Sequence, residues 1–318
     1  MRKRIILFGL VLSLLCGCGA NPSAPEKDKL TIVATTYPIY LFASAVTEGV
    51  EGVEVERLNT GSVSCLHDYT LSMTDMKKIE QADVIAINGA GLEEFMEDAL
   101  AASDAQVIDC SQNIHLLENL SHHHHEEEDA EEDDHGHGHD HGHWDPHYWM
   151  DPTKARLMAQ NITDALAEQD AANEATYREN FKFINQTLVT LELNMGFMIR
   201  DNDVSGLITF HDGFQYFAHA FDLPLLEAIE EEAGSEASAK EIVEITELVK
   251  EYNIPVIFTE VNGSDATAKA ISRETGCQVA QLSMIMDGES DSLLAYFDAQ
   301  LNNMEAVCGG FEKEVAAQ

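Results

Sequence analysis

The sequence predicts an α/β protein of two lobes, each with a parallel sheet flanked by helices, joined by one long rigid helix. First, short apolar runs alternate with helical patterns in both halves of the chain, which is typical of parallel sheets covered by helices. Second, a single helical stripe of apolar residues lies between the halves. Third, 318 residues exceed what one hydrophobic core usually supports.

The N-terminus has the features of an export signal. A basic patch at residues 2–4 precedes the apolar run Ile5–Leu15, which is shorter than the roughly 20 residues that a membrane-spanning helix needs. The run ends in Leu15-Cys16-Gly17-Cys18, which resembles a bacterial lipobox. We therefore expect a lipoprotein signal peptide over 1–17, a lipid on Cys18 and a tether over 18–29, which would anchor the chain to the outer face of the cytoplasmic membrane. A freely cleaved signal peptide with incidental cysteines is the alternative.

The charge balance excludes one class of partner. The chain has 18 basic and 57 acidic residues, with a formal net charge of −39. Binding to nucleic acid requires a basic footprint, so no nucleic acid is expected as a partner. Such an excess of acid also attracts cations to the surface.

We expect the protein to be a monomer.

Four cysteines follow Cys18, namely Cys65, Cys110, Cys277 and Cys308. They form no CxxC pair, which argues against a thiolate zinc site of the finger or ribbon kind. An oxidising compartment permits a disulfide. Cys277 with Cys308 is the pair that we expect, although the sequence alone does not establish a pairing.

The expected strands and helices divide between an N-terminal lobe over 30–172 and a C-terminal lobe over 201–318. The strands are predicted at Leu30–Thr35, Val53–Leu58, Val84–Asn88, Gln106–Ile108, Gly206–Phe210, Pro255–Thr259 and Gln278–Leu282. The helices are predicted at Met73–Gln81, from Asp151-Pro152 onward, and near Lys240–Tyr252, Ser264–Thr275 and Ser290–Val307.

The helix predicted over 173–200 is the most regular in the sequence. Its apolar residues recur at spacings of three and four, at Tyr177, Phe181, Ile184, Leu188, Leu191, Met195 and Met198. At about 1.5 Å per residue the helix is about 42 Å long. Its length and position favour a rigid connection between two lobes over an ordinary amphipathic helix on one of them.

Residues 121–144 break all periodicity. They contain nine of the 14 histidines, interleaved with Glu, Asp and Gly, at His122, His123, His124, His125, His135, His137, His139, His141 and His143. The segment has almost nothing apolar to bury, so we expect a disordered loop. Imidazoles and carboxylates attract divalent metals, so the loop is expected to collect metal as an accessory to the main site.

Five histidines lie outside this loop, and three of them are placed where an open α/β sheet binds ligands, beyond the carboxyl ends of its strands. His211 directly follows a predicted strand, His67 lies in the loop after Val53–Leu58, and His147 lies in a stiff turn before the helix at Asp151. The other two, His115 and His219, are expected to be ordinary surface or packed histidines.

Three neutral imidazoles with a fourth carboxylate or water suit tetrahedral zinc. We therefore predict a metal cleft between the lobes, with His67 and His147 from one side and His211 from the other. The fourth position is open: Glu260, at the end of a predicted strand, is the first choice. Asp287, Cys65 and water are the alternatives.

Several motifs between about Lys29 and the C-terminus occur together. They are His67-Asp68-Tyr69, Asn88-Gly89-Ala90-Gly91-Leu92-Glu93, Asp145-Pro146-His147-Tyr148-Trp149-Met150-Asp151-Pro152, Phe210-His211-Asp212-Gly213-Phe214 and Ile257-Phe258-Thr259-Glu260. The chain resembles the zinc- and manganese-binding lipoproteins of bacterial ABC importers, whose lobes are joined by one long helix. The resemblance implies that His67, His147 and His211 bind the metal. The acidic, His-rich insertion before His147 resembles the zinc-transporting branch.

One position departs from the family pattern. Many members have a carboxylate directly after the last strand, whereas this chain has Ser283 near that place. Serine is a poor zinc ligand, so Glu260 or an open position with water is expected instead.

The resemblance implies that the chain captures Zn2+ as a transported ligand and delivers it to the membrane permease of an ABC importer, without catalysis. Manganese in place of zinc is one alternative, and a zinc buffer or adhesin lipoprotein that meets no permease is another. A zinc hydrolase can also use a three-histidine site. The sequence has no HExxH run and no evident general base, which disfavours that class.

Overall fold

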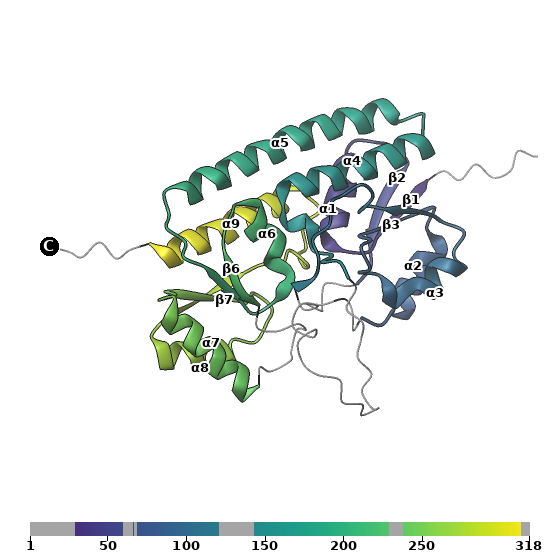
Figure 1. Ribbon diagram of the computed structural model, residues 1–318. Coiled ribbons are helices and arrows are strands. Elements are labelled where there is room, and N and C mark those ends of the chain that lie inside the picture. The colour runs from purple at the N-terminus through teal and green to yellow at the C-terminus, as the bar shows by residue number, and fades with distance from the viewer. Residues whose placement is uncertain (1–28, 60–65, 67–68, 121–142, 229–237, 313–318) are drawn as a thin grey trace, which may run out of the picture.

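The computed structural model describes residues 29–59, 66, 69–120, 143–228 and 238–312, and these residues form two parallel four-stranded sheets. The N-terminal sheet has the order β2-β1-β3-β4 and the C-terminal sheet has the order β6-β5-β7-β8. Figure 1 shows the sheets in separate halves of the molecule, with helices around each. The predicted fold class is confirmed. The strands are β1 (Leu30–Ala34), β2 (Val53–Arg57), β3 (Val84–Ile87), β4 (Gln106–Asp109), β5 (Leu207–Thr209), β6 (Leu225–Ala228), β7 (Val256–Glu260) and β8 (Gln278–Leu282).

The helices cover both faces of each sheet. They are α1 (Tyr37–Val46), α2 (Met73–Gln81), α3 (Glu97–Ala102), α4 (Pro152–Gln169), α5 (Glu174–Arg200), α6 (Gln215–Ala220), α7 (Ala239–Glu251), α8 (Ala266–Thr275) and α9 (Leu294–Phe311), with 3-10 turns η2 (Glu94–Met96), η4 (Tyr148–Met150) and η5 (Asp212–Phe214). Asp151 caps α4 by accepting a hydrogen bond from the Thr153 N–H at 2.7 Å, with Pro152 in the first turn as predicted. None of the helices in these ranges is both long and apolar enough to cross a bilayer.

The long helix α5 is anchored on both halves. Its buried side chains lie on one stripe, which includes Tyr177, Leu188 and Met195. It packs against α1 and α4 in the N-terminal half and against α9 in the C-terminal half, and Figure 1 shows it running the length of the molecule. The Asn180 side chain donates to the main-chain oxygen of Val46 at 2.9 Å, which fixes α5 to the end of α1.

One hydrophobic core continues between the two halves. It includes Ile32 of β1, Phe258 of β7 and the inner stripe of α5. The rings of Phe42 in α1 and Tyr296 in α9 meet edge to face, with their centroids 5.1 Å apart. Two smaller clusters fill the opposite faces of the sheets, under α2 and α3 in one half and under α7 and α8 in the other.

The expected disulfide between Cys277 and Cys308 is wrong, because both thiols are free and buried. Cys277 lies in the cluster under α7 and α8, whereas Cys308 lies in the continuous core and its thiol is 3.5 Å from the Met198 main-chain oxygen. The two side chains are therefore on opposite faces of the C-terminal sheet. Burial raises the pKa of both thiols, which keeps them protonated.

Several predicted features lie outside the described residues. They are the signal peptide, the tether, Cys18, Cys65, His67 and all of the His-rich loop except its last positions, from His143 on. These features stay predictions.

Candidate metal centre

His147 lies in the loop that leads to α4, and Asp145 orients its ring. The Asp145 Oδ1 atom accepts hydrogen bonds from the His147 main-chain N–H and from its Nδ1, both at 2.8 Å. Both residues are buried. Because the Nδ1 proton points to the carboxylate, Nε2 carries the lone pair that can bind a metal.

Asn88 holds the residues on either side of His147. Its side-chain amide donates to the Pro146 main-chain oxygen at 3.0 Å, and its own main-chain oxygen accepts from the Tyr148 hydroxyl at 2.6 Å. Asn88 directly follows β3. The carboxyl end of this strand therefore sets the position of the His147 loop.

Glu93 in turn fixes Asn88. Its carboxylate accepts from the main-chain N–H groups of Asn88 and Gly89, at 2.6 and 2.9 Å, and from the Thr35 hydroxyl at 2.6 Å. Burial raises the pKa of Glu93 to about 7, although these three donors act in the opposite direction. A buried carboxyl group that titrates near neutral pH thus underlies the His147 loop.

His211 lies just beyond β5, separated from it by Phe210, and only 2% of its surface is exposed. The Gly213 N–H donates to Nδ1 at 2.9 Å, and an Asp212 carboxylate oxygen lies 3.1 Å from the same nitrogen. Nε2 is buried and has no hydrogen-bond partner within the described part of the chain. Buried polar atoms are nearly always paired, so Nε2 is the atom of this ring that is available to a ligand.

Acidic neighbours surround His211. Burial by itself lowers the pKa of His211, but Asp212, followed by Glu260 and Asp145, outweighs burial and raises that pKa. The Asp212 carboxylate favours a proton on Nδ1, and this tautomer leaves the Nε2 lone pair free. The Gly213 N–H competes for Nδ1. Binding of a metal at Nε2 would require the proton on Nδ1, and therefore the interaction with Asp212 in place of that with the Gly213 N–H.

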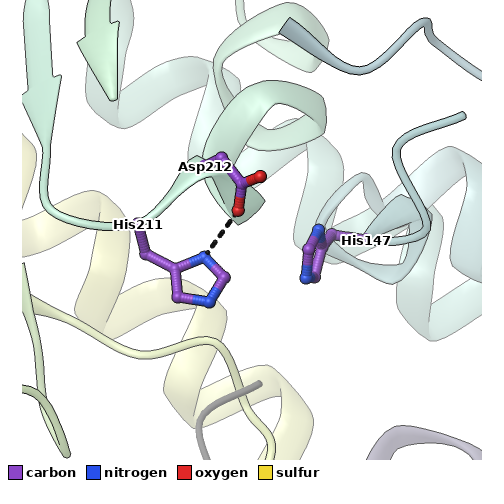
Figure 2. Close-up of side chains that lie close together, drawn as sticks. All are labelled: His147, His211 and Asp212. Atoms are coloured by element: carbon purple, nitrogen blue, oxygen red, sulfur yellow. Dashed lines mark ion pairs between the residues drawn. The ribbon is translucent and has the colours of Figure 1, made fainter. Parts of the chain in front are cut away.

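His147 and His211 come from different halves of the chain and face each other. Their ring centroids are 5.4 Å apart at an interplanar angle of 87°, and Figure 2 shows Asp212 beside the His211 ring. One ligand atom from each of these three residues lies within 4.8 Å of the other two. Zinc–ligand bonds of about 2.0–2.2 Å place two ligand atoms of one ion at most about 4.4 Å apart, which is comparable with this spacing.

Glu260 adds a carboxylate from the C-terminal sheet. It ends β7 and is buried. Burial raises the pKa of Glu260, and the positive charges that His211 and His147 can carry act in the opposite direction. Glu260 therefore interacts electrostatically with both rings, but it is not part of the cluster of possible metal ligands among the described residues, and its role as a ligand stays a prediction.

Gly213 allows the two halves to approach closely at this site. A Cβ atom there would lie 2.2 Å from the Met284 Cε and 3.1 Å from the His147 Cδ2. The Met284 main-chain oxygen also accepts a hydrogen bond from the Trp149 indole N–H at 2.9 Å. A larger residue at position 213 would therefore displace the Met284 side chain and crowd the His147 ring.

Two of the three predicted histidines, His147 and His211, lie together in the cluster, whereas the predicted Glu260 is not part of it among the described residues. The third, His67, is outside the described residues. Asp212 belongs to the cluster but was not predicted as a ligand. Its position next to His211 in an otherwise apolar segment was the available signal.

Two other residues considered for the fourth ligand position, Asp287 and Ser283, lie away from this cluster. Asp287 lies 3.9 Å from Arg57 and is half-exposed. The Ser283 N–H donates to the Asn303 side chain at 2.8 Å, and its hydroxyl accepts from the Ile285 N–H at 3.1 Å. These two residues serve the loop after β8 and are absent from the cluster among the described residues.

Three histidines with no predicted place in the main site are exposed. His115 and His219 are on the surface, as expected. His143, at the end of the His-rich loop, packs its ring against Trp144 at 4.5 Å, and its Nε2 lies 3.9 Å from a carboxylate oxygen of Glu118.

The fold and the site define a class of protein: two α/β halves on one long helix, with a buried pair of histidines and acidic side chains between the halves. The model of the family described as "Zinc-uptake complex component A periplasmic" matches residues 32–308, and the chain belongs to this family.

Individual relatives agree with this assignment. The chain is 28% identical over 332 residues to the zinc-binding protein AdcA of Streptococcus pyogenes, covering 96% of this chain and 61% of that protein. It is 29% identical over 305 residues to the high-affinity zinc uptake system protein ZnuA of Bacillus subtilis, covering 92% of each. The chain thus spans less than two thirds of the AdcA sequence.

Among solved structures, a crystal structure of ZnuA matches with a TM-score of 0.75 and 24% sequence identity, covering 90% of this chain and 100% of the other. Likeness at this level of identity supports the two-lobed fold.

Proposed function

We propose that this chain captures Zn2+ between its two halves, outside the cytoplasm, and delivers it to the membrane permease of an ABC importer. The observation that carries the proposal is the pair of buried imidazoles, His147 and His211, which different halves of the chain hold in an edge-to-face arrangement with their centroids 5.4 Å apart. The matching family description, which names an uptake component, supports the same role.

The ligand chemistry favours zinc. Imidazole nitrogen suits zinc, whereas manganese prefers carboxylate and other oxygen ligands. His147 presents Nε2 because Asp145 holds its Nδ1 proton, and His211 has its Nε2 buried without a partner in the described ranges. We propose that Glu260 adds one oxygen and that His67 completes a set of three imidazoles.

The role is that of a carrier and not of an enzyme. Each acidic group near the histidines is buried beside them or is hydrogen-bonded to them, as Asp145 and Asp212 are. Such carboxylates balance the charge of a bound cation. The proposed chemistry is therefore binding and release.

The remaining parts of the proposal concern location and supply. The lipobox at Cys18 would anchor the mature, monomeric chain to the outer face of the cytoplasmic membrane. The histidines between 121 and 144 would raise the local supply of metal. The halves over 30–172 and 201–318, joined by the helix at 173–200, would each offer a surface to the permease.

Elemental analysis of the protein purified without added metal tests the proposal directly. We expect about one zinc ion per chain in the tight site, with weaker binding from the His-rich segment. His147→Ala and His211→Ala should each weaken binding at the tight site by more than about 100-fold. Tight binding that survives both substitutions, or a purified protein that prefers manganese, would contradict the proposal.

A further inference from the structure

The hydroxyl of Tyr216 links the two sides of the metal site. Tyr216 lies in α6, the helix that follows His211, and is fully buried. Its hydroxyl donates to the Asp145 main-chain oxygen at 2.8 Å and accepts from the Leu117 N–H at 2.9 Å. One side chain near His211 therefore holds the segment that carries His147.

The segment that Tyr216 holds is itself paired. The Asp145 N–H donates to the Leu117 main-chain oxygen at 2.9 Å, and Glu118 forms an antiparallel bridge with Trp144. The side chain of Gln215, also in α6, donates to the Glu118 main-chain oxygen at 3.2 Å. Helix α6 thus contacts this paired segment at two successive positions.

Asp145 connects this hydrogen-bonded segment to His147, the proposed metal ligand. Its Oδ1 atom accepts from both the main-chain N–H and the Nδ1 of His147, which fixes the ring in position and places its proton on Nδ1. Its main chain is held by Tyr216 and Leu117. The path from α6 to the His147 ring therefore consists of two hydrogen-bonded residues.

The Tyr216 hydroxyl is suited to this link at all ordinary pH values. Burial raises the pKa of Tyr216 well above its usual value, so the hydroxyl keeps its proton. The Lys154 ammonium group lies 5.5 Å from the ring centroid, on its face. The ring is held from both its face and its hydroxyl end.

We infer that Asp145 and Tyr216 are positioning residues, which set the tautomer of His147 and its distance from His211 before the metal arrives. The inference rests on the proposed function, because it assumes that both histidines bind zinc. It adds two residues that touch no metal and explains how ligands from separate halves are held in register.

The first test measures zinc affinity by competition with a chelator. Asp145→Asn keeps the size of the side chain but removes its charge, and it should weaken binding about 10- to 100-fold, as the loss of outer-shell partners does. Tyr216→Phe keeps the ring but loses two hydrogen bonds, and it should weaken binding about three- to tenfold. Tyr252→Phe, at an exposed tyrosine at the end of α7, is the matched control and should change affinity less than twofold.

A double-mutant cycle distinguishes a positioning role of Asp145 from a merely structural one. In a His147→Ala background, Asp145→Asn should have no further effect on zinc affinity if Asp145 acts through His147. An equal effect in both backgrounds would overturn the inference. If His147→Ala itself left zinc binding intact, the proposed metal site would fail first, and the two failures are therefore distinguishable.

Spectroscopy provides a measurement that does not depend on the stability of each variant. In the metal-free protein at pH 8, nitrogen-15 NMR should show the His147 proton on Nδ1, and Asp145→Asn should shift it toward Nε2. The visible spectrum of the Co2+-loaded protein should change in Tyr216→Phe but not in Tyr252→Phe. A proton found on Nε2 in the unmodified protein would refute the inference even if Asp145→Asn does not fold.

Discussion

The indole N–H of Trp149 donates to the main-chain oxygen of Met284 across the boundary between the two halves, at 2.9 Å. Trp149 is fully buried, and its own main-chain oxygen accepts from the Tyr296 hydroxyl at 2.6 Å. The residue therefore joins the turn beside His147 to the loop after β8 and to α9. A buried group that links so many elements is expected to contribute strongly to stability.

Trp149→Phe should lower the free energy of unfolding by about 2 kcal/mol or more, because it leaves the buried Met284 oxygen unpaired and removes part of a packed ring. Trp144→Phe is the matched control, since Trp144 is 42% exposed, and it should change stability by less than about 0.5 kcal/mol. Urea unfolding of the three proteins measures the difference. Equal losses in both variants would contradict the assigned role.

His211→Ala should weaken zinc binding by more than the roughly 10- to 100-fold that loss of an outer-shell partner costs. His219→Ala removes an exposed histidine four residues beyond Gln215 and should change affinity less than twofold. His211→Glu should narrow the difference between zinc and manganese, because it supplies a harder ligand. Competition titrations against a chelator measure the affinity of each variant for both metals. Comparable damage from the two alanine variants would refute the ligand assignment.

Replacing Ser121–His143 with a short linker should leave one tight zinc site and remove several weak ones. The Asn119 N–H donates to the His143 main-chain oxygen at 3.1 Å, so the two ends of the replaced segment lie side by side. Titration calorimetry of both proteins checks this expectation. His211→Ala in the shortened protein is the control and should abolish the remaining tight site. Loss of that site on replacement alone would mean that the replaced residues supply ligands.

Glu93 should make stability depend on pH. Its pKa is raised from 4.5 to about 7 in the folded protein. Below pH 4.5 the carboxyl group is protonated in both folded and unfolded states. Between pH 4.5 and about 7 only the unfolded state ionises, so stability decreases as pH rises. The decrease from this group amounts to about 3 kcal/mol and is complete above the folded pKa.

Glu93→Gln tests this dependence, because the amide does not titrate. The unfolding free energy of the wild type minus that of the variant should fall between pH 4.5 and about 7 and stay constant at higher pH. Glu94→Gln, at the exposed neighbouring position, should give a difference that does not vary over this range. A rising difference for Glu93→Gln would show that the three donors outweigh burial.

Short apolar runs in the sequence predicted the strands well, because they indicate which segments are buried. Each predicted strand agrees with the structure to within one residue at both ends. The missed strand, β6 (Leu225–Ala228), is only half-buried along its whole length and carries a glutamate. The missed helices include α1 and the short α3; α1 is apolar on nearly all sides, with a mainly buried surface, and so it shows no amphipathic stripe.

The site was predictable where its residues follow strands. His211 and Glu260 were singled out because they lie at the ends of predicted strands, and His147 because it lies in a stiff turn before the helix at Asp151; their roles as ligands stay predictions. Asp145 and Tyr216 were not, since their contact joins residues 71 apart and depends on how the two halves pack. The Cys277–Cys308 pairing failed for a related reason: spacing along the chain does not reveal which face of a sheet a side chain occupies.

Helix α5 is one uninterrupted element that packs on α1 and α4 at one end and on α9 at the other. Because it is anchored on both halves, it restrains the distance between their outer surfaces. Under the proposed function, a permease that contacts both halves would then meet nearly the same outline with and without bound zinc. Discrimination between the zinc-loaded and empty forms would then depend on the change in charge at His147 and His211 and on the loops that surround them.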